Sequence, residues 1–266
     1  MHFKMGDFSI AYDDIGHGPE IIFIHGFPLC KAMWGPQTGT LVASGYRVIT
    51  FDLPGFGDSD PMPISKMSDY AEVLLKLMNH LRIPKAIIAG MSMGGYVLQE
   101  FMARYPEKFE AALLIATRAQ ADDEAGKQKR SDLITAVKQG QKEKLVSAFE
   151  SVLFSDDTPN KSPDLIQLVR NWMQHTSDQG LIDGLNAMKM RMERYHTLSG
   201  FAYPGWILHA DGDKAIPLQY AREIEQTMGH CRLDVIQGAG HMVNMEKAKE
   251  FNHLLLKFLG EIFGLQ

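Results

Sequence analysis

One short segment, where a serine lies between glycines as an apolar run gives way to a helical pattern, constrains the fold more than any other feature. The apolar run covers residues 86–89, and the turn after it reads Gly90-Met91-Ser92-Met93-Gly94. Apolar side chains then recur at helical spacing, at Val97, Leu98, Phe101, Met102 and Tyr105. A strand that turns sharply into a helix strains the serine backbone, and glycine is required beside it. The segment therefore predicts a strand, a tight turn and a helix, with the Ser92 hydroxyl raised at the turn.

The pattern G-x-S-x-G at a strand-to-helix turn is typical of a nucleophilic serine whose hydroxyl stands above a sheet. The next backbone N–H, that of Met93, then begins a helix and can stabilise an oxyanion. A glycine-rich turn with a solvated serine is the competing interpretation. The choice depends on whether the chain also supplies a base and an acid, because a serine hydroxyl alone is a poor nucleophile.

Both partners occur downstream, in the order serine, acid, histidine, and each follows a predicted strand. The candidate base is His241, in Gly238-Ala239-Gly240-His241, where glycines allow a loop to carry an imidazole over the serine. The candidate acid lies in Asp211-Gly212-Asp213. Asp211 can also be interpreted as a turn residue that accepts hydrogen bonds from nearby backbone N–H groups. The residues alone therefore leave Asp211 and Asp213 as alternative acids.

A second oxyanion donor is expected in the loop His25-Gly26-Phe27-Pro28, which follows the predicted strand at residues 21–24. The backbone N–H of Phe27 would act together with that of Met93. A tight turn with a buried phenylalanine is the other interpretation, and both can hold because the backbone donates while the side chain packs. We expect His25 to form hydrogen bonds within this loop and Asp52 to hold neighbouring loops.

Strand and helix patterns alternate along most of the chain. Strands are predicted at residues 8–12, 21–24, 48–51, 86–89, 111–116, 206–209 and 233–236, and helices at 68–81 and 251–262. This alternation predicts an α/β fold with a mostly parallel, doubly wound sheet. Residues 117–200 instead carry three helical apolar stripes, which are Leu145, Ala148, Phe149 and Val152; Leu165, Leu168, Val169 and Trp172; and Leu181, Leu185, Met188 and Met192. The predicted organisation is a core in two parts, 1–116 and 201–266, interrupted by a helical insertion at 117–200.

Taken together, the motifs resemble the α/β-hydrolase fold superfamily. The matching segments are HGFP at 25–28, DLPGFGDS at 52–59, GMSMGG at 90–95, the two aspartates at 211–213 with Pro217, and GAGH at 238–241. The resemblance implies that Asp213, the second aspartate of its segment, is the acid of the triad. It also implies that residues 117–200 form a helical cap inserted after the sixth core strand. The forms of the serine and HGFPL segments are similar to those of bacterial carboxylesterases, C–C bond hydrolases and cofactor-free haloperoxidases (perhydrolases).

This resemblance makes a serine hydrolase that cleaves a carboxylic ester through an acyl-enzyme the leading hypothesis. Ser92 excludes the branches of the superfamily that use an aspartate nucleophile, which are haloalkane dehalogenases and epoxide hydrolases. A C–C bond hydrolase, a lactonase or a perhydrolase would use the same triad. A ligand receptor that binds its ligand under the cap is the alternative from another class, and the intact triad argues against it. No cofactor or metal is required, and no ligand cluster with metal spacing occurs.

The substrate is expected to be a small or medium ester, or a related carbonyl compound, in a mainly apolar pocket. The chain contains 16 methionines, whose side chains adapt to irregular apolar ligands. The predicted lining residues are Met91, Trp172, Met188, Met192 and Met242. The competing interpretation is that these methionines simply pack the cap on the core. Three arginines could instead bind a substrate carboxylate, although each is expected at the surface: Arg118, Arg191 and Arg194.

Composition narrows the setting in which such an enzyme would act. The formal net charge of −5 argues against nucleic acid as the main partner. Cys30 and Cys231 are isolated and are expected to be free thiols in a reducing compartment. The start of the sequence has no secretory pattern and no run of about 18 apolar residues occurs, so we expect a cytoplasmic protein without a membrane span. The sequence does not specify an oligomeric state.

Overall fold

The predicted strands join one sheet in the computed structural model, which describes residues 1–263. Within these residues the sheet has eight strands in the order β1-β2-β4-β3-β5-β6-β7-β8. The strands are β1 (His2–Met5), β2 (Phe8–Ile15), β3 (Glu20–Ile24), β4 (Arg47–Phe51), β5 (Ala86–Met91), β6 (Phe109–Ile115), β7 (Gly205–Ala210) and β8 (Cys231–Ile236). From β4 to β8 neighbouring strands run parallel, whereas β1 and β2 pair antiparallel. The mostly parallel α/β sheet is therefore confirmed.

Of the eight strands in the described residues, β1 is the one that the sequence pattern did not predict. It contains four residues, and Phe3 is the one that is buried. A single buried side chain gives no alternation to detect, so this strand depends on its pairing with β2. Phe3 packs against Tyr12 and His80, with ring centroids 6.1 Å and 5.3 Å away.

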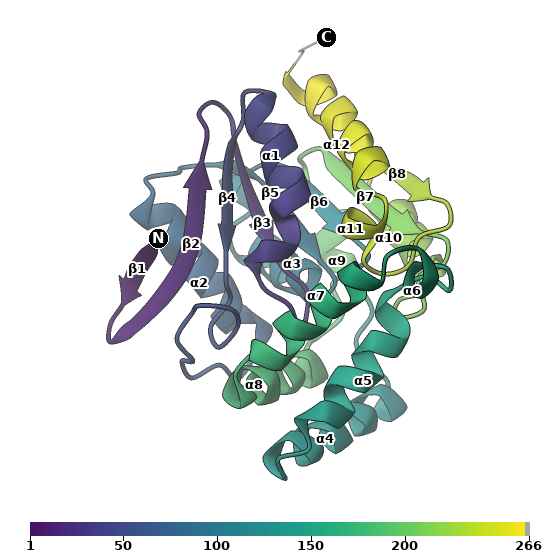
Figure 1. Cartoon of the computed structure of the whole chain (residues 1–266). Coiled ribbons are helices and arrows are strands. Elements are labelled where there is room, and N and C mark those ends of the chain that lie inside the picture. The colour runs from purple at the N-terminus through teal and green to yellow at the C-terminus, as the bar shows by residue number, and fades with distance from the viewer. Residues whose placement is uncertain (264–266) are drawn as a thin grey trace.

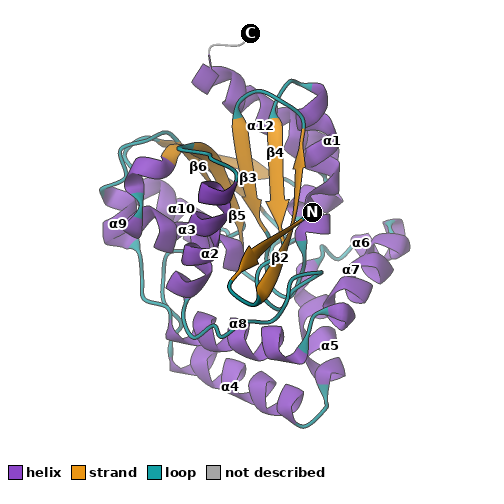
Figure 2. Cartoon of the chain, turned by 90° about the vertical axis from the view of Figure 1, so that its left-hand side faces the viewer, coloured by secondary structure: helices purple, strands orange, loops and turns teal. Residues whose placement is uncertain are grey.

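Helices cover both faces of the sheet, as Figures 1 and 2 show. On one face lie α1 (Gly35–Ala43) and α12 (Ala248–Phe263), and on the other α2 (Met67–His80), α3 (Met93–Arg104) and α10 (Gln219–Thr227). Each face buries its own apolar layer against the sheet. Strand β5 lies between the layers and all six of its residues are buried, which explains its continuous apolar run. The shorter elements are η1 (Lys31–Trp34), η2 (Pro106–Lys108) and α11 (Val243–Glu246).

Six helices lie between β6 and β7 in the described chain. They are α4 (Glu124–Lys138), α5 (Lys142–Leu153), α6 (Thr158–Lys161), α7 (Pro163–His175), α8 (Asp178–Met190) and α9 (Tyr195–Ser199). Figures 1 and 2 place α4, α5, α7 and α8 below the sheet, at the end to which the parallel strands point. Helix α9 instead contacts α3 and α10 beside the sheet. We refer to α4–α8 as the inserted helices.

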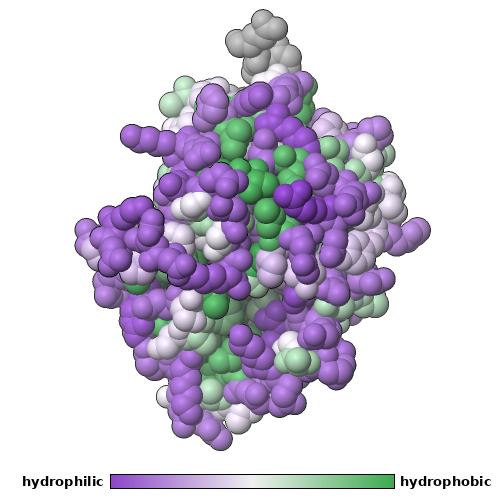
Figure 3. All heavy atoms as spheres, turned by 90° about the vertical axis from the view of Figure 1, so that its right-hand side faces the viewer, coloured by the Kyte–Doolittle hydropathy of each residue, from purple (hydrophilic) through white to green (hydrophobic). Residues whose placement is uncertain are grey.

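Strand β8 forms one edge of the sheet and is less buried than the parallel strands next to it. Its residues from Cys231 to Val235 are only half-buried. Figure 3 shows this side of the molecule, where apolar side chains reach the surface as a band among hydrophilic ones. Among the described residues, no helix combines the length and the apolar character needed to cross a bilayer.

Candidate active site

The backbone at Ser92 has the strained geometry that the glycine pattern predicts. Ser92 has φ 54° and ψ −116°, in the left-handed half of the map that non-glycine residues rarely adopt. A Cβ atom at Gly90 would lie 2.3 Å from the carbonyl oxygen of Gly94. A Cβ atom at Gly94 would lie 2.3 Å from the carbonyl oxygen of Ile24. Both glycines are therefore required by close backbone approach around the serine.

This strained turn also exposes the serine. From Ala86 to Gln99, Ser92 is the one residue that is not buried. Its backbone is fixed on both sides, because its N–H donates to Ile115 over 3.0 Å and its carbonyl accepts from the Thr117 hydroxyl over 2.9 Å. The turn therefore presents a partly accessible hydroxyl on a rigid, otherwise buried support.

A buried carboxylate–imidazole pair lies at the ends of two neighbouring strands. Asp213 follows β7 and His241 follows β8, and they are 7% and 2% exposed. His241 Nδ1 donates to Asp213 Oδ2 over 2.7 Å. The other carboxylate oxygen accepts the N–H groups of Ala215 and Ile216, each over 2.8 Å. These bonds fix the imidazole so that its Nε2 is the nitrogen able to take up a proton.

The environment keeps Asp213 ionised. Burial would raise the pKa of its carboxyl group, but the charge and the hydrogen bond of His241 outweigh burial and hold that pKa below its ordinary value. In the described residues no hydrogen bond joins the Ser92 hydroxyl to His241. Such bonds are commonly long before substrate binds and tighten in the complex.

A second histidine, which sequence reasoning did not single out, supports the carboxylate from behind. His209 is fully buried at the end of β7, and its Nε2 lies 2.8 Å from the carbonyl oxygen of Ile216 and 3.4 Å from Asp213 Oδ2. Burial lowers the pKa of His209, so the ring is neutral at pH 7. Its position near the end of the strand that precedes the acid, four residues before Asp213, was the available signal.

Two other carboxylates hold the histidine loop. Asp211 accepts the N–H of Gly238 over 2.7 Å, so it bonds a backbone N–H of another loop rather than one within its own turn. Glu246 accepts the N–H groups of Gly240 and Ser155, each over 2.9 Å. Glu246 thereby ties the loop that carries the histidine to the chain between α5 and α6, a link that the sequence analysis missed.

The loop after β3 lies against the serine. A Cβ atom at Gly26 would be 3.4 Å from Ser92 Cβ, which is van der Waals contact. In the described residues the N–H groups of Phe27 and Met93 donate to no protein acceptor; Met93 is the first residue of α3, where no intrahelical partner exists. Two unused backbone donors therefore lie on segments that meet at Ser92.

Hydrogen bonds fix this loop from below, as the sequence analysis expected. His25 Nδ1 lies 2.9 Å from the carbonyl oxygen of Gly26, and its Nε2 accepts the N–H of Leu53 over 2.9 Å. Asp52 accepts the N–H groups of Lys31 and Asp58 over 2.6 Å and 3.0 Å. The Phe27 side chain is buried against Phe149 of α5, with ring centroids 5.1 Å apart.

A cavity of about 210 Å³ opens beside these loops. Ala215 lines it and also donates its N–H to Asp213, and Phe149 lines it while packing on Phe27. Its apolar lining residues are Leu133, Ala148, Phe149 and Val152. Its charged lining residues are four cations, Arg118, Lys129, Arg130 and Lys214, and the carboxylate of Asp122. The lining of this cavity is therefore mixed, whereas the sequence predicts a mainly apolar pocket.

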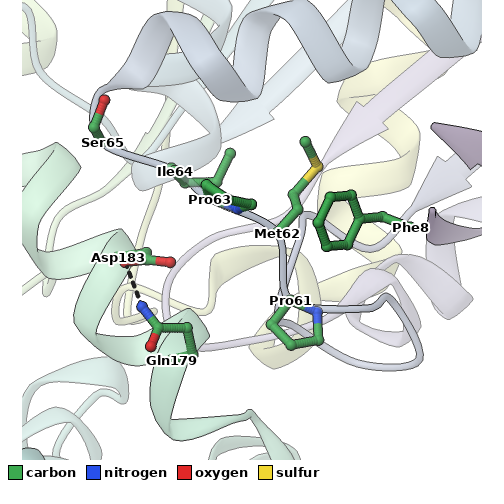
Figure 4. A pocket seen from close by; sticks show the side chains of 8 residues that line it. All are labelled: Phe8, Pro61, Met62, Pro63, Ile64, Ser65, Gln179 and Asp183. Atoms are coloured by element: carbon green, nitrogen blue, oxygen red, sulfur yellow. Dashed lines mark hydrogen bonds between the residues drawn. The ribbon is translucent and has the colours of Figure 1, made fainter. Parts of the chain in front are cut away.

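A larger hollow of about 540 Å³ lies elsewhere, between the loop at residues 61–65 and α8 (Figure 4). Phe8 and Met62 give it apolar character, and Asp183 and Gln179 of α8 face it, joined by a 2.8 Å hydrogen bond. It contains none of the predicted site residues, and burial alone raises the pKa of Asp183. The smaller cavity is the one whose lining residues contact the site, through the Ala215 N–H that donates to Asp213 and through Phe149 packed on Phe27.

The predicted pocket residues have different fates. Met91 and Met242 are fully buried in the apolar layer beneath α1 and α12. Met188 packs in the opposite layer, with its Sδ 3.3 Å from Arg130, and Trp172 is half-buried on α7. Met192 is 65% exposed and lies beyond α8, which ends at Met190, so the prediction that it continues the helical stripe of α8 is wrong, while its role in the pocket stays a prediction.

One of the three arginines expected at the surface is instead buried. The Arg191 side chain is only 4% exposed and pairs with Asp122 over 2.9 Å. Arg118 also pairs with Asp122, and Arg194 pairs with Glu100. Asp122 compensates part of the charge of Arg191, and the ring of Tyr96 packs against the guanidinium, 4.2 Å from its carbon. Within residues 1–263, no three His, Cys, Asp or Glu side chains come together as a metal site.

Comparison with known proteins identifies the family to which the chain belongs. A family model described as the alpha/beta hydrolase fold matches residues 19–248. The chain belongs to the α/β-hydrolase family. It is 30% identical over 263 residues to a Synechocystis protein named as a non-heme chloroperoxidase, covering 94% of this chain and 95% of that one. It is 26% identical to the 3-oxoadipate enol-lactonase 1 of Acinetobacter baylyi, covering 96% and 93%.

Among solved structures, the chain is similar to a thermophilic esterase from Thermogutta terrifontis with malate bound. The two proteins are 27% identical, and the match covers 96% of this chain and 94% of the esterase with a TM-score of 0.93. The relatives of this α/β-hydrolase thus carry names that span esterase, lactonase and haloperoxidase activities. The family is one of hydrolases, and the names of these relatives do not specify a single reaction within it.

Proposed function

We propose that this α/β-hydrolase is a serine hydrolase that cleaves a carboxylic ester through an acyl-enzyme. The proposal rests on one observation. The strained, partly exposed Ser92 follows β5 at the same end of the parallel strands as Asp213 and His241, a buried pair joined over 2.7 Å. Serine, acid and base then have the roles of nucleophile, orienting group and proton carrier. The similarity to an esterase over 96% of the chain supports this choice among the reactions of the family.

In the proposed mechanism His241 Nε2 takes the proton of Ser92 as Oγ attacks the ester carbonyl carbon. Asp213 stays ionised and stabilises the imidazolium that forms. The N–H groups of Phe27 and Met93 stabilise the oxyanion. When the intermediate collapses, the C–O bond breaks and His241 returns the proton to the leaving alcohol. Water then attacks the acyl-enzyme by the same proton path, which releases the acid and regenerates Ser92.

We further propose that residues 117–200 act as a cap, with the inserted helices supplying the substrate pocket. The apolar lining residues Leu133, Ala148, Phe149 and Val152 of the 210 Å³ cavity would receive the body of a small or medium substrate. Figure 2 supports this arrangement, because α4, α5 and α8 lie across the end of the sheet to which the parallel strands point. Neither buried Met188 nor half-buried Trp172 lines this cavity, so both would contribute packing rather than direct contacts.

A lactonase, a C–C bond hydrolase or a perhydrolase remains a second candidate on the same residues. The observation that favours it is the naming of the relatives, which include a chloroperoxidase and an enol-lactonase. The first steps would be the same, and the acyl acceptor or the broken bond would differ. Hydrogen peroxide in place of water at the second step would give a peracid rather than an acid.

The test is hydrolysis of p-nitrophenyl esters from acetate to octanoate by wild type, Ser92→Ala and Asp213→Asn. Loss of a triad member lowers kcat by about 10⁴-fold or more. We expect burst release of p-nitrophenol by wild type and none by Ser92→Ala. Wild type that hydrolyses neither esters nor lactones, or Ser92→Ala that keeps its activity, would refute the proposal. Peracid formed with hydrogen peroxide present, at a rate above ester hydrolysis, would favour the second candidate.

A further inference from the structure

Strand β8 has a free edge. In the described residues it is the last strand of the sheet, beside β7, and no strand pairs with its outer side. Its residues from Cys231 to Val235 are half-buried, and Figure 3 shows apolar side chains at the surface on this side of the molecule. An edge strand presents unpaired backbone N–H and C=O groups, so it is able to pair with a strand of another chain.

The hydrogen bonds between β7 and β8 show which backbone groups of β8 point outward. The carbonyl oxygen of His230 accepts the N–H of Gly205 over 2.7 Å, and that of Ile236 accepts the N–H of Asp211 over 3.2 Å. Consecutive residues of the two strands pair in one parallel register between these bonds. Because the backbone groups of successive residues in a strand point to opposite sides, the even-numbered residues of β8 bond to β7. The residues that direct their N–H and C=O groups away from the sheet are therefore Cys231, Leu233 and Val235.

These outward groups favour one register for the pairing of β8 with a second copy of itself. In an antiparallel pair, two residues exchange both hydrogen bonds only where the outward groups of one face the outward groups of the other. All three outward residues are used when Leu233 lies opposite Leu233 of the second copy, and Cys231 then lies opposite Val235. A shift by two residues in either direction leaves Cys231 or Val235 opposite a residue beyond the bounds of β8. We call the first arrangement the centred register.

The two charged residues of β8 are complementary in this register. Arg232 and Asp234 lie on the same face of the strand, and their side chains are 28% and 26% exposed. In the centred register each Arg232 lies opposite Asp234 of the other copy. A shift by two residues would place Arg232 opposite Arg232 or Asp234 opposite Asp234, and like charges directly opposite are unfavourable. Charged side chains on an edge strand commonly prevent pairing, whereas these two opposite charges favour pairing with a second copy in one register.

Contacts within one chain hold both side chains in place for this pairing. Arg232 donates to Asp234 over 2.9 Å and to Glu261 of α12 over 2.7 Å. Asp234 also accepts the indole N–H of Trp206 over 2.7 Å. The side chains are therefore already ordered beside the free edge, so pairing with a second copy costs little further side-chain entropy.

We propose that the protein forms a two-fold symmetric dimer through antiparallel pairing of β8 with β8 of a second copy, centred on Leu233. The same surface then serves both protomers, as a two-fold axis requires. The sheets of the two protomers continue into one another across the axis. Helices α10 and α12 cover β8 on opposite faces, so each lies on the same face as its own copy. The pairing uses none of Ser92, Asp213 and His241 and is independent of the proposed function.

The experiment measures the molecular mass in solution by sedimentation equilibrium over a range of protein concentrations. We expect wild type to have twice the mass of the chain and to dissociate on dilution. Two charge reversals then test the register. Asp234→Arg gives β8 two positive charges and Arg232→Asp gives it two negative charges, so each variant alone repels its own copy. An equimolar mixture of the two variants places opposite charges across the axis again and should form the heterodimer.

We expect each single variant to dimerise about 30-fold more weakly than wild type, which equals about 2 kcal/mol for two cross-strand pairs changed from attraction to repulsion. The mixture should recover most of this loss. Mixing repairs no bond within either chain, so recovery arises only from pairing between chains. The control is Asp132→Arg, which makes the same change of charge at an exposed position on α4 and should leave dimerisation unchanged.

Hydrogen exchange of wild type decides the question if a single variant is unfolded by far-UV circular dichroism. Pairing protects the N–H groups of Cys231, Leu233 and Val235, so protection of a peptide that covers β8 should rise with protein concentration. Wild type that keeps the mass of one chain up to about 100 μM overturns the proposal. A dimer that neither charge reversal weakens, a mixture as weak as its components, or protection that is independent of concentration overturns it as well.

Discussion

Replacement of Asp122 by asparagine tests how the inserted helices are joined to the core. The substitution keeps the size of the side chain and removes the single negative charge among Arg118, Arg130 and Arg191. Removing one partner of a buried ion pair costs about 3–5 kcal/mol, because the other charges stay buried without compensation. The Arg118 side chain is 20% exposed and that of Arg130 16%, so part of their charge can be solvated. We therefore expect a loss of about 3 kcal/mol, at the lower end of that range.

The assay is urea unfolding at pH 7, followed by far-UV circular dichroism and tryptophan fluorescence together. The matched control is Asp157→Asn, which breaks an exposed pair with Lys161 and should cost no more than about 1 kcal/mol. A cost of Asp122→Asn below that of Asp157→Asn would refute the argument that the cluster depends on this charge.

The same pair of proteins has a defined pH dependence. Burial would raise the pKa of Asp122, but hydrogen bonds and charge from Arg130, with charge from Arg191 and Arg118, outweigh it and lower that pKa. A lowered folded-state pKa means that the stabilisation is fully present above the unfolded-state pKa, near 3.9. It is lost as the pH falls below that value toward the folded-state pKa. The difference in unfolding free energy between wild type and Asp122→Asn should therefore shrink only below about pH 4.

Two further predictions concern the support of the serine and of the acid. Gly94→Ala should lower the free energy of unfolding by about 1–3 kcal/mol and abolish ester hydrolysis, because its Cβ would lie 2.3 Å from the Ile24 carbonyl oxygen. The control is Gly39→Ala in α1, which has open space around it and should leave the melting temperature unchanged or raise it. Burial lowers the pKa of His209, so its folded state resists protonation and stability should fall as the pH drops below about 6.5. His209→Gln should weaken this fall in the urea midpoint between pH 7.5 and 5.5, and an unchanged slope would contradict the assignment.

The parts of the fold that the sequence predicts are those with a local cause. The strained turn at Ser92 requires a glycine two residues before it and another two residues after it, so a five-residue sequence motif is enough to predict the turn. Strand β5 and helix α3 follow from runs of apolar residues long enough to show a period. The hydrogen bonds of His25 and Asp52 were also expected, although two of them join residues 21 and 28 positions apart in the chain.

The parts that the sequence does not predict depend on contacts between distant segments. Asp122 and Arg191 are 69 positions apart in the numbering, and no periodicity relates them. The sequence alone also does not distinguish a buried arginine from an exposed one, because only the tertiary partners differ. The end of α8 at Met190 was missed because the apolar spacing continues to Met192, while the chain has left the helix. Burial of Met91 and Met242 within the core was equally hidden, since methionine suits a core and a pocket.

The proposed triad lies on the core sheet, whereas the proposed pocket also uses the inserted helices. This difference affects how the specificity of the site is set. Ser92, Asp213 and His241 all follow strands of one sheet, so their relative positions are fixed by the register of the core. The 210 Å³ cavity instead combines Arg118 and Ala215 of the core with residues of α4 and α5, so its shape depends on how the inserted helices are docked. Docking therefore completes the proposed pocket without altering the proposed triad. It follows that variants that loosen the inserted helices should change the preference among p-nitrophenyl esters of different chain length before they lose hydrolysis of the acetate.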